Sequence, residues 1–276
     1  MRFTKMHGLG NDFLLVDDRE PRAVDWPSLA RGVCARHTGV GADGILLVQR
    51  SETADLRLRV VNADGSDAEM CGNGVRCAAV YAAAERIAGE RVRWETAAGT
   101  VTTELLGDGA VRVDMGPPRL RAAEVPFEHD DEQALDVPLV IGGGRLRVSA
   151  VGMGNPHCVV VVDDLDDCPV ERLGAALQRH PRFRRSVNVE FVQVLSRSRV
   201  RQRTVERGVG ETDACGTGAC AAVVALVSLG IVDSPAWVEL RGGVLEVAWR
   251  PGGTVLMTGP AVTVFHGELS AGPAGR

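Results

Sequence analysis

The pattern Cys-Gly-x-Gly occurs twice in this chain, and its repetition constrains the fold more than any other feature. The first copy begins at Cys71 and the second at Cys215, 144 residues later. Each copy follows a polar, turn-rich segment and precedes an apolar run, which is typical of a loop that leads into a helix. The pair Gly10-Asn11 recurs at the same offset as Gly154-Asn155. The sequence therefore predicts two copies of one structural unit.

The duplication divides the chain into two predicted domains. With 276 residues, of which 45% are hydrophobic, each copy has enough chain to bury a core of its own. A Gly-Pro-Pro turn at 116–118 marks the boundary. We therefore expect an N-terminal domain over 1–117 and a C-terminal domain over 118–260. The last strand, within 261–276, is expected to return to the first domain.

Each domain is expected to have an α+β fold, in which a curled, mostly antiparallel sheet surrounds one central helix. The central helices, predicted over 71–88 and 215–230, are apolar nearly all round, so both must be buried. Shorter helices are predicted over 27–37 and 169–180. Alternating or β-branched segments predict strands at 13–17, 45–48, 56–62, 91–95, 100–106, 111–115, 158–162, 187–194, 200–206, 237–240, 244–249, 255–257 and 261–268.

The composition argues against several classes of partner. The net charge is −5 and the basic residues are scattered, which does not resemble a nucleic-acid-binding surface. The start of the chain lacks an apolar signal segment, and no stretch reaches about 18 uninterrupted apolar residues. We expect a cytoplasmic protein without a nucleic-acid or membrane partner. Its ligand is expected to be small and neutral-to-cationic or zwitterionic.

The seven cysteines predict reduced thiols rather than a disulfide framework, since their number is odd and no secretory signal precedes them. Their spacing does not match zinc ligands and no His pair completes a site, so no metal is expected. The letters of 39–44 match a dinucleotide fingerprint but precede a predicted strand, so no such cofactor is expected. Burial as small hydrophobes is the prediction for Cys34, Cys158, Cys168, Cys77 and Cys220.

A buried helix that starts with Cys-Gly-x-Gly offers a seat for an anion. Its first backbone N–H groups and the positive end of its dipole point at whatever lies before it. The glycines let a carboxylate or phosphate approach the backbone closely. The same helix start is expected to lower the pKa of the thiol from about 8.5 toward neutrality.

Two such cysteines on pseudo-symmetric domains predict a narrower chemistry. If the helix starts face each other across a cleft and hold one carboxylate, the thiols lie on opposite faces of its α-carbon. One thiolate can then remove the α-proton while the other thiol delivers a proton from the opposite face. Each N–H donor that stabilises the developing charge contributes about 3 kcal/mol. This inversion of a stereocentre needs no cofactor.

Polar residues at strand ends are the candidates for the rest of the pocket. Asn11 and Asn155 stand before apolar strands at equivalent positions of the two copies, which favours ligand contact over a simple turn role. Glu206 and Arg207 together offer a carboxylate for an ammonium group and a guanidinium for a second carboxylate. His157 is either a satisfied core histidine or a neighbour that tunes the pKa of a thiol.

These residues carry a resemblance to the diaminopimelate epimerase family. The matching segments span nearly the whole chain: Met6 to Phe13, Asn62 to Ser66, Cys71 to Cys77, Gly154 to Cys158, Asn188, and Glu206 through Gly218. The resemblance implies an isomerase that interconverts LL- and meso-diaminopimelate in lysine and peptidoglycan precursor synthesis. It also implies catalysis without a cofactor, in a two-domain protein that forms a homodimer.

The resemblance implies roles for individual residues. Cys71 and Cys215 would be the acid/base pair, and His157 and Glu206 would tune the thiols. Gly44 replaces a glutamine that contacts substrate in many members, and Phe265 replaces a tyrosine of the dimer contact. The substrate-binding set would be Asn11, Gly44, Asn62, Gly72, Asn73, Asn155, Asn188, Glu206, Arg207, Gly216 and Thr217.

Three alternatives stay open at this point. One is a racemase of proline, hydroxyproline or another amino acid on the same scaffold, for which Glu206 and Arg207 would not be needed. Another is a thiol switch or metal-binding protein built on the cysteine pairs of the two central helices. A module that binds small acids without turning them over is the third.

Overall fold

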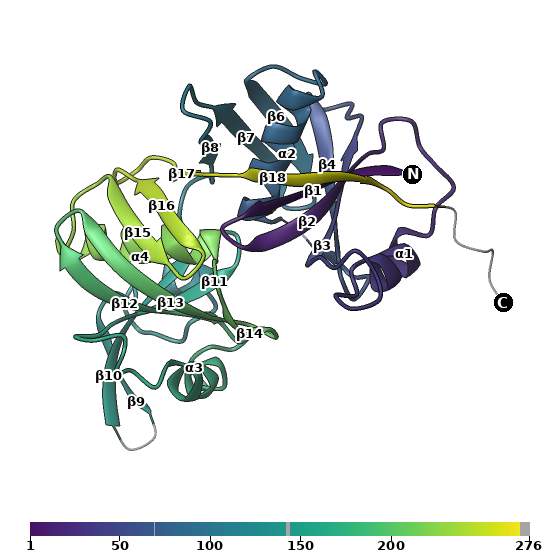
Figure 1. Ribbon diagram of the computed structural model, residues 1–276. Coiled ribbons are helices and arrows are strands. Elements are labelled where there is room, and N and C mark those ends of the chain that lie inside the picture. Colours follow the sequence, from purple (N-terminus) through teal and green to yellow (C-terminus); the bar gives the residue numbers. More distant parts are fainter. Residues whose placement is uncertain (69, 142–143, 271–276) are drawn as a thin grey trace. The chain divides into compact units, whose positions relative to one another are not determined.

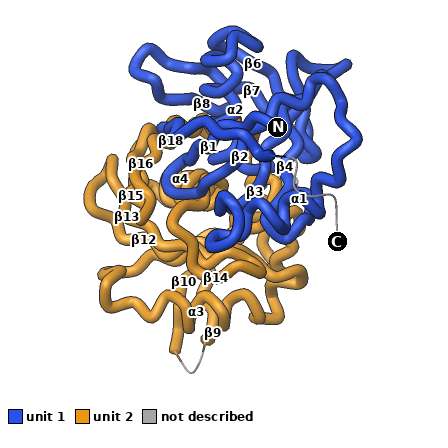
Figure 2. The backbone as a smooth tube through the Cα atoms, turned by 45° about the vertical axis from the view of Figure 1, so that its right-hand side comes forward, with its two compact units in different colours: residues 1–113, 259–276 blue, residues 114–258 orange. Residues whose placement is uncertain are grey.

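The computed structural model describes residues 1–68, 70–141 and 144–270 and is shown in Figure 1. The chain forms two compact units, coloured separately in Figure 2. Unit 1 consists of Met1–Val113 together with Gly259–Arg276, and unit 2 is the continuous segment Asp114–Thr258. Each unit is described by itself below.

Unit 1 is a mixed sheet with two helices between its strands. Its parallel pairs, β2 with β3 and β4 with β6, are each joined through a helix, as parallel connections require. Antiparallel pairing joins β1 with β2, β3 with β4, and β6 with β7. The elements are β1 (Arg2–Gly8), β2 (Asn11–Asp17), α1 (Trp26–Val33), β3 (Gly44–Gln49), β4 (Leu56–Asn62), β5 (Asp67–Ala68), α2 (Gly72–Ala84), β6 (Arg91–Thr96), β7 (Gly99–Leu105), β8 (Val111–Asp114) and β18 (Val262–Glu268).

Unit 2 repeats this order. Its parallel pairs, β11 with β12 and β13 with β15, again enclose one helix each. Antiparallel pairing joins β10 with β11, β12 with β13, and β15 with β16. The elements are the 3₁₀ turn η1 (Ala122–Glu124), β9 (Val137–Ile141), β10 (Gly144–Gly152), β11 (Pro156–Val161), α3 (Val170–Gln178), β12 (Asn188–Ser196), β13 (Arg199–Glu206), β14 (Gly210–Thr212), α4 (Gly216–Ser228), β15 (Ala236–Leu240), β16 (Gly243–Ala248) and β17 (Leu256–Gly259).

The helices α2 and α4 occupy the centres of the two units. All residues of α4 from Gly218 to Leu226 are buried, and the helix packs against β10, β11, β12, β15 and β16. In the same way, α2 packs against β1, β2, β3, β4 and β7. A helix that is apolar all round finds such an environment only inside a sheet. The predicted α+β fold, with a mostly antiparallel sheet around one central helix in each copy, is confirmed.

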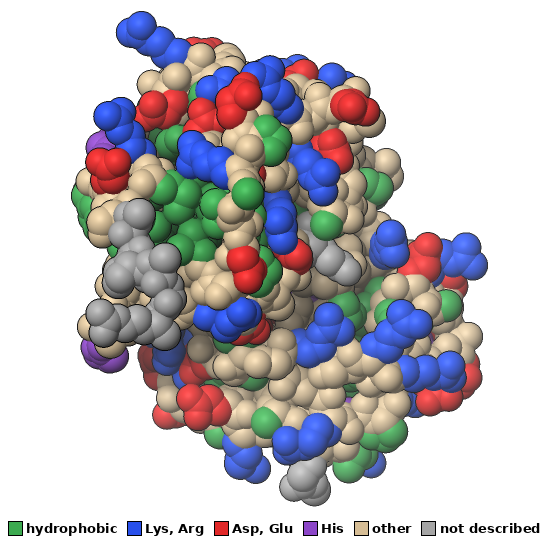
Figure 3. Space-filling view, turned by 90° about the vertical axis from the view of Figure 1, so that its right-hand side faces the viewer, with side chains coloured by type: hydrophobic (Ala, Val, Ile, Leu, Met, Phe, Trp, Pro, Cys, Tyr) green, Lys and Arg blue, Asp and Glu red, His purple; other side chains and the backbone are tan. Residues whose placement is uncertain are grey.

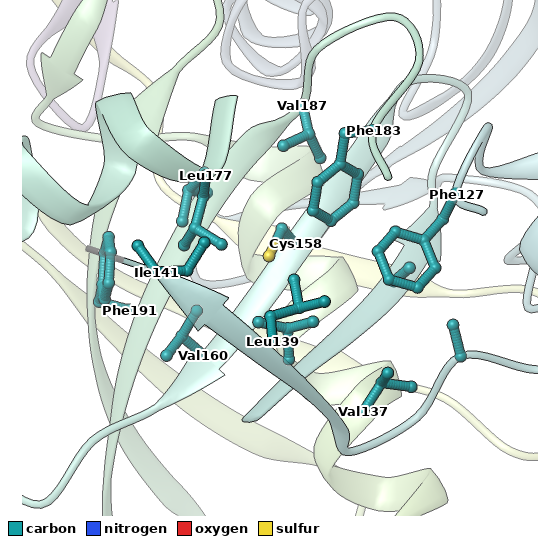
Figure 4. Packing of buried hydrophobic residues seen from close by; sticks show 14 of the residues in the cluster. Phe127, Val137, Leu139, Ile141, Cys158, Val160, Leu177, Phe183, Val187 and Phe191 are labelled. Atoms are coloured by element: carbon teal, nitrogen blue, oxygen red, sulfur yellow. The ribbon is translucent and has the colours of Figure 1, made fainter. Parts of the chain in front are cut away.

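A second layer of core lies on the α3 side of the unit 2 sheet (Figure 4). Phe127 and Phe183 pack with their ring centroids 4.7 Å apart, and Leu177 of α3 is fully buried beside the sheet. The sulfur of Cys158 lies among these side chains. Cys34 is buried in the equivalent cluster of unit 1. The predicted burial of these two cysteines as small hydrophobes is confirmed.

Five strands that the sequence pattern did not predict are the very short β5 and β14, and the longer β1, β9 and β10. β1 buries Thr4 and Lys5 beside its apolar residues, so it lacks a clear alternation of apolar and polar positions. β9 contains Pro138 and pairs only with β10 among the described strands, a position where proline is tolerated. The helices begin where predicted within one residue, but α2 ends at Ala84 rather than near Gly89, because Arg86 adopts a left-handed conformation with φ 55°.

The surface carries charges of both signs, and Figure 3 shows basic and acidic side chains on one face. The most apolar exposed segment on unit 1 is β18, where Val262, Val264 and Phe265 are 46%, 54% and 44% exposed. β18 pairs along its length with β1. Within residues 1–68, 70–141 and 144–270, no helix is long and apolar enough to cross a membrane.

Candidate active site

Cys71 occupies the N-cap of α2. Its backbone is extended, with φ −136° and ψ 112°, and its sulfur accepts a hydrogen bond from the Gly74 N–H at 3.3 Å. Serine and threonine oxygens usually make this bond. The thiol of Cys71 in turn faces the side-chain oxygen of Asn11 at 3.5 Å. The first turn of the central helix therefore holds the sulfur directly.

Asn11 is oriented by Asp43, a residue that the sequence analysis did not select. The Asn11 Nδ2 group donates to Asp43 Oδ2 at 2.7 Å. Because a carboxylate only accepts, this contact fixes the amide so that Oδ1 points away from Asp43. Asn11 Oδ1 then receives a hydrogen bond from Asn73 Nδ2 at 3.3 Å. Arg36 Nη2 holds the other oxygen of Asp43 at 2.7 Å.

Cys215 is the N-cap of α4 in unit 2, but among the described residues its side chain makes no capping hydrogen bond of the kind seen at Cys71. Its backbone is also extended, with φ −118° and ψ 107°, and the residue is only 5% exposed. Its sulfur lies 3.5 Å from Thr217 Oγ1. Asn155, the counterpart of Asn11, donates from Nδ2 to the same hydroxyl oxygen at 3.4 Å. The two helix starts are therefore built from equivalent positions of the two copies.

His157 is fully buried and makes two short contacts. Its Nδ1 atom lies 2.8 Å from Glu190 Oε1, and its Nε2 atom lies 2.8 Å from Asn155 Oδ1. The side chains of His157 and Glu190 are both 0% exposed. Both ring nitrogens of His157 therefore have partners, and the Nε2 contact leads toward Asn155. Glu190 was not selected from the sequence, although a single acidic residue within the apolar strand β12 was a signal for it.

Glu206 lies at the end of β13 beside Cys215. Burial raises the pKa of Glu206, while hydrogen bonds from Thr212 and Cys215 and the charge of His157 oppose the increase. The hydroxyl of Thr212, another residue missed from sequence, donates to Glu206 Oε1 at 2.6 Å. Glu206 thus adds an acceptor next to the thiol.

The pKa of Cys215 differs from the sequence expectation. Burial raises it well above the usual value for a thiol, and the charges of Glu206 and Glu190 add to the increase. The Thr217 hydroxyl and the Gly218 N–H act in the opposite direction. The expectation that the helix start brings this thiol to neutrality is therefore wrong for Cys215, because burial beside two carboxylates outweighs it.

Gly44 lies at a tight point between strands. It pairs with Asn62 in the β3–β4 ladder, and a Cβ atom at Gly44 would lie 2.6 Å from the Val61 carbonyl oxygen. A side chain there would require β4 to shift. Asn62 itself uses its Nδ2 group to bind Ser66 Oγ at 2.9 Å. Gly44 can therefore offer only backbone atoms to a ligand.

Arg207 and Asn188 are neighbours in unit 2. The side-chain oxygen of Asn188 accepts a hydrogen bond from the Arg207 N–H at 2.8 Å. The exposed Arg207 guanidinium donates to the Arg185 carbonyl at 3.1 Å. The structure thus brings Asn155, Glu206 and Thr217 close to Cys215 and leaves Arg207 further out, at the exposed end of β13. Gly72 and Gly216 are the first residues of the two central helices.

The second cysteine of each helix does not have the properties of a reactive thiol. Burial raises the pKa of Cys77 to about 12, and Cys220 is 0% exposed. A thiol switch needs a cysteine with a low pKa that dissolved oxidants can reach. Among the described residues, no three His, Cys, Asp or Glu side chains are grouped as metal ligands would be. These observations weigh against the thiol-switch alternative.

Solved structures of other proteins share this duplicated architecture. A Bacillus anthracis phenazine biosynthesis protein of the PhzF family aligns over 98% of this chain and 99% of its own, with a TM-score of 0.70 and 18% identity. A hydroxyproline epimerase from Agrobacterium vitis aligns over 97% and 91%, with a TM-score of 0.68 and 19% identity. At these identities the likeness defines a fold class, whose solved members include that epimerase.

Within that class, the chain belongs to the diaminopimelate epimerase family. The family model, described as diaminopimelate epimerase, matches residues 3–121 and 149–264. A diaminopimelate epimerase from Pelotomaculum thermopropionicum is 50% identical over 97% of this chain and 98% of its own length. The likeness to the hydroxyproline epimerase, at 19% identity, concerns the fold alone. The family membership therefore favours an epimerase of diaminopimelate over a racemase of a cyclic amino acid.

Proposed function

We propose that this enzyme, an isomerase, interconverts LL- and meso-diaminopimelate. The observation that carries the proposal is the N-cap position of Cys71 and Cys215 on the two central helices in a chain of this family. The reaction would supply meso-diaminopimelate for lysine and peptidoglycan precursor synthesis. It uses no cofactor, because both proton transfers are made by side chains of the chain itself.

The reaction exchanges one proton on each face of the α-carbon. One cysteine thiolate takes the α-proton, so that a C–H bond breaks and an S–H bond forms, and the electron pair passes into the adjacent carboxylate. The other thiol then gives its proton to the opposite face of the carbon. In the reverse direction the two cysteines exchange roles. N–H groups of the first helical turn stabilise the charge that develops on the carboxylate.

The substrate-binding residues are proposed from their places around the two thiols. Asn11 and Asn73 lie at Cys71, and Asn155 and Thr217 lie at Cys215. The helix starts at Gly72 and Gly216 would bind the reacting carboxylate. The distal amino-acid end of the substrate would be bound by Asn62, Asn188, Glu206, Arg207 and the backbone of Gly44, and thiol tuning would come from His157 and Glu206.

Exchange of the α-proton in heavy water tests the proposal. Wild-type protein should introduce deuterium at the α-carbon of diaminopimelate and interconvert its LL and meso forms, followed by NMR. Cys71→Ala and Cys215→Ala should each reduce epimerisation by orders of magnitude. Cys168→Ala is the matched control, because this partly buried cysteine packs against the α3 cluster and belongs to neither helix start. Full epimerisation by either active-site variant would refute the assignment.

The assembly and location of the enzyme are separate proposals. We propose a homodimer that forms through the apolar residues of β18, where Phe265 contacts Phe3 edge to face at 5.9 Å between centroids and remains 44% exposed. We also propose two domains, with the boundaries 1–117 plus 261–276 and 118–260. The enzyme would work in the cytoplasm on a small-molecule substrate, without a membrane or nucleic-acid partner.

A further inference from the structure

A chain of polar contacts in unit 2 connects a buried carboxylate to the Cys215 sulfur. It runs from Glu190 to His157 at 2.8 Å and from His157 to Asn155 at 2.8 Å. It continues from Asn155 to the Thr217 hydroxyl at 3.4 Å and from that hydroxyl to the Cys215 sulfur at 3.5 Å. We call these five residues the relay. All of them belong to unit 2.

The carboxylate at the inner end of the relay is confined. Glu190 Oε1 contacts His157, and Glu190 Oε2 is buried without a hydrogen-bond partner among the described residues. The first turn of α4 lies against it, because a Cβ atom at Gly218 would be 2.6 Å from Glu190 Oε1. A buried carboxylate requires a charged or hydrogen-bonded partner. The described partner of Glu190 is His157.

Each ring nitrogen of His157 faces an oxygen atom, Glu190 Oε1 at Nδ1 and Asn155 Oδ1 at Nε2. We assign the direction of the relay from these oxygen atoms, which accept hydrogen bonds from ring N–H groups. The Asn155 oxygen then accepts from His157, which leaves the Asn155 NH₂ group to donate to Thr217. The Thr217 hydroxyl, already accepting one hydrogen bond, is left to donate its proton to the Cys215 sulfur.

In unit 1 the described contacts of the equivalent asparagine are different. There the amide of Asn11 is held by Asp43 and presents its oxygen to the Cys71 sulfur. An acceptor oxygen favours the protonated thiol, whereas a donating hydroxyl favours the thiolate. Asn11 therefore favours the protonated thiol of Cys71, whereas Asn155, acting through Thr217, favours the thiolate of Cys215.

We propose that Glu190 is a positioning residue of the reaction: through His157 and Asn155 it turns the Thr217 hydroxyl so that this hydroxyl donates to the Cys215 sulfur and stabilises its thiolate. The inference rests on the proposed function for its catalytic meaning, but the relay itself is a property of the folded chain.

The titratable groups around His157 come from four elements. Glu190 faces it from β12, and Glu206 acts on it from β13. Cys215 and Cys220 belong to α4, and Cys158 follows His157 on β11 but packs into the α3 cluster. From β10, Val151 pairs with His157. Glu206 reaches the Cys215 thiol from β13 and is also affected by the charges of Glu190 and His157.

The reactivity of Cys215 tests the relay, because only the thiolate reacts with iodoacetamide. Alkylation is measured on the folded chain at pH 7.5, and the Cys215 peptide is quantified by mass spectrometry. Glu190→Gln keeps the shape of the side chain and should slow alkylation about tenfold, as expected for loss of one hydrogen bond to a charged sulfur. A purely Coulombic role predicts the opposite sign, because the Glu190 charge raises the pKa of Cys215.

Thr217 provides the matched pair of variants. Thr217→Val removes the hydroxyl and should slow alkylation to the same degree, whereas Thr217→Ser keeps it and should react like wild type. The double variant with Glu190→Gln and Thr217→Val should be no slower than Thr217→Val, because both changes act on one hydrogen bond. If Glu190→Gln does not fold, as judged by circular dichroism, the Thr217 pair decides alone.

Several results would overturn the relay. These are a Glu190→Gln protein that reacts as fast as wild type or faster, additive effects in the double variant, equal rates for the two Thr217 variants, or no detectable alkylation of wild-type Cys215. The measurement needs no substrate, so it is independent of the deuterium exchange assay. Absence of epimerisation with the expected alkylation pattern would refute the proposed function and leave the relay standing.

Discussion

The glycine at the third position of α4 is under a tighter steric limit than its counterpart in α2, and one substitution at each site measures the difference. A methyl group at Gly218 would lie 2.6 Å from Glu190 Oε1 and 3.1 Å from its Cγ. That carboxylate is fully buried and bound to His157, so it has little room to move. At Gly74 the nearest atom to a new methyl group is the end of Leu46, at 3.1 Å.

The expected magnitude follows from two opposing effects. Alanine is more favourable than glycine inside a helix by about 1 kcal/mol. Overpacking a core costs about 1–3 kcal/mol, and separating a buried ion pair costs about 3–5 kcal/mol. Gly218→Ala should therefore destabilise the protein by about 2 kcal/mol if the pair moves as a unit, and by about 4 kcal/mol if it breaks. Gly74→Ala should stay within about 1 kcal/mol of wild type.

Urea denaturation followed by circular dichroism gives the two free energies of unfolding. A loss of 2 kcal/mol corresponds to a fall in Tm of about 4–8 °C for a chain of this size. Hydrogen exchange of the α4 amides shows whether the loss is confined to unit 2. If Gly218→Ala is as stable as Gly74→Ala, the carboxylate is not held in place as described, and the argument for a confined Glu190 fails with it.

Three further predictions concern single side chains. At pH 8 the free energy of unfolding of Glu206→Gln should exceed that of wild type by on the order of 1 kcal/mol, and below the ordinary glutamate pKa of 4.5 the two should be equal. Burial raises the pKa of Glu206 in the folded protein, so the wild type loses stability as the pH rises through that raised pKa. Urea denaturation at both pH values measures this, and a gain that persists at acid pH would contradict it. Asp12→Asn should cost about 3 kcal/mol, because the largely buried Lys5 would lose a carboxylate 2.6 Å from its Nζ atom. Burial opposes ionisation of Asp12, but Arg36 and Lys5 lower its pKa. The difference in stability between Asp12→Asn and wild type should therefore vanish as the pH falls well below 3.8. Equal stability of the two proteins at pH 7 would refute this prediction. Phe265→Glu should convert a dimer to monomers in sedimentation velocity, with Val140→Glu, on β9, as the exposed control; an unchanged sedimentation coefficient would exclude β18 as the interface.

The central helices were the most predictable part of the fold. Their apolar sequence predicted that both helices are buried inside a sheet. The Cys-Gly-x-Gly pattern predicted the first residue of each helix to within one position. β1 was not predictable from alternation, because the buried Lys5 interrupts its apolar pattern. The partner that makes this burial possible, Asp12, comes from the neighbouring strand. A buried charge whose partner lies on another strand cannot be predicted from the local sequence pattern.

The candidate site shows the same division. Repetition of Asn11 as Asn155 marked both residues as part of the helix-start environment, and both lie there. Repetition could not show that their amides are oriented differently, because that depends on Asp43 and His157, which do not occupy equivalent positions in the two copies. The raised pKa of Cys215 could not be predicted from the sequence either, because burial is its main cause.

The position of β18 in the chain has a consequence during synthesis. Unit 2 is one continuous segment, so it can complete its sheet as soon as it has left the ribosome. Unit 1 cannot, because Arg2 of β1 pairs with Glu268 of β18, almost at the other end of the chain. At about 5–20 residues per second, β1 remains without this neighbour for tens of seconds. The nascent chain therefore exposes an open strand edge, of the kind that recruits other strands, until β18 has been made.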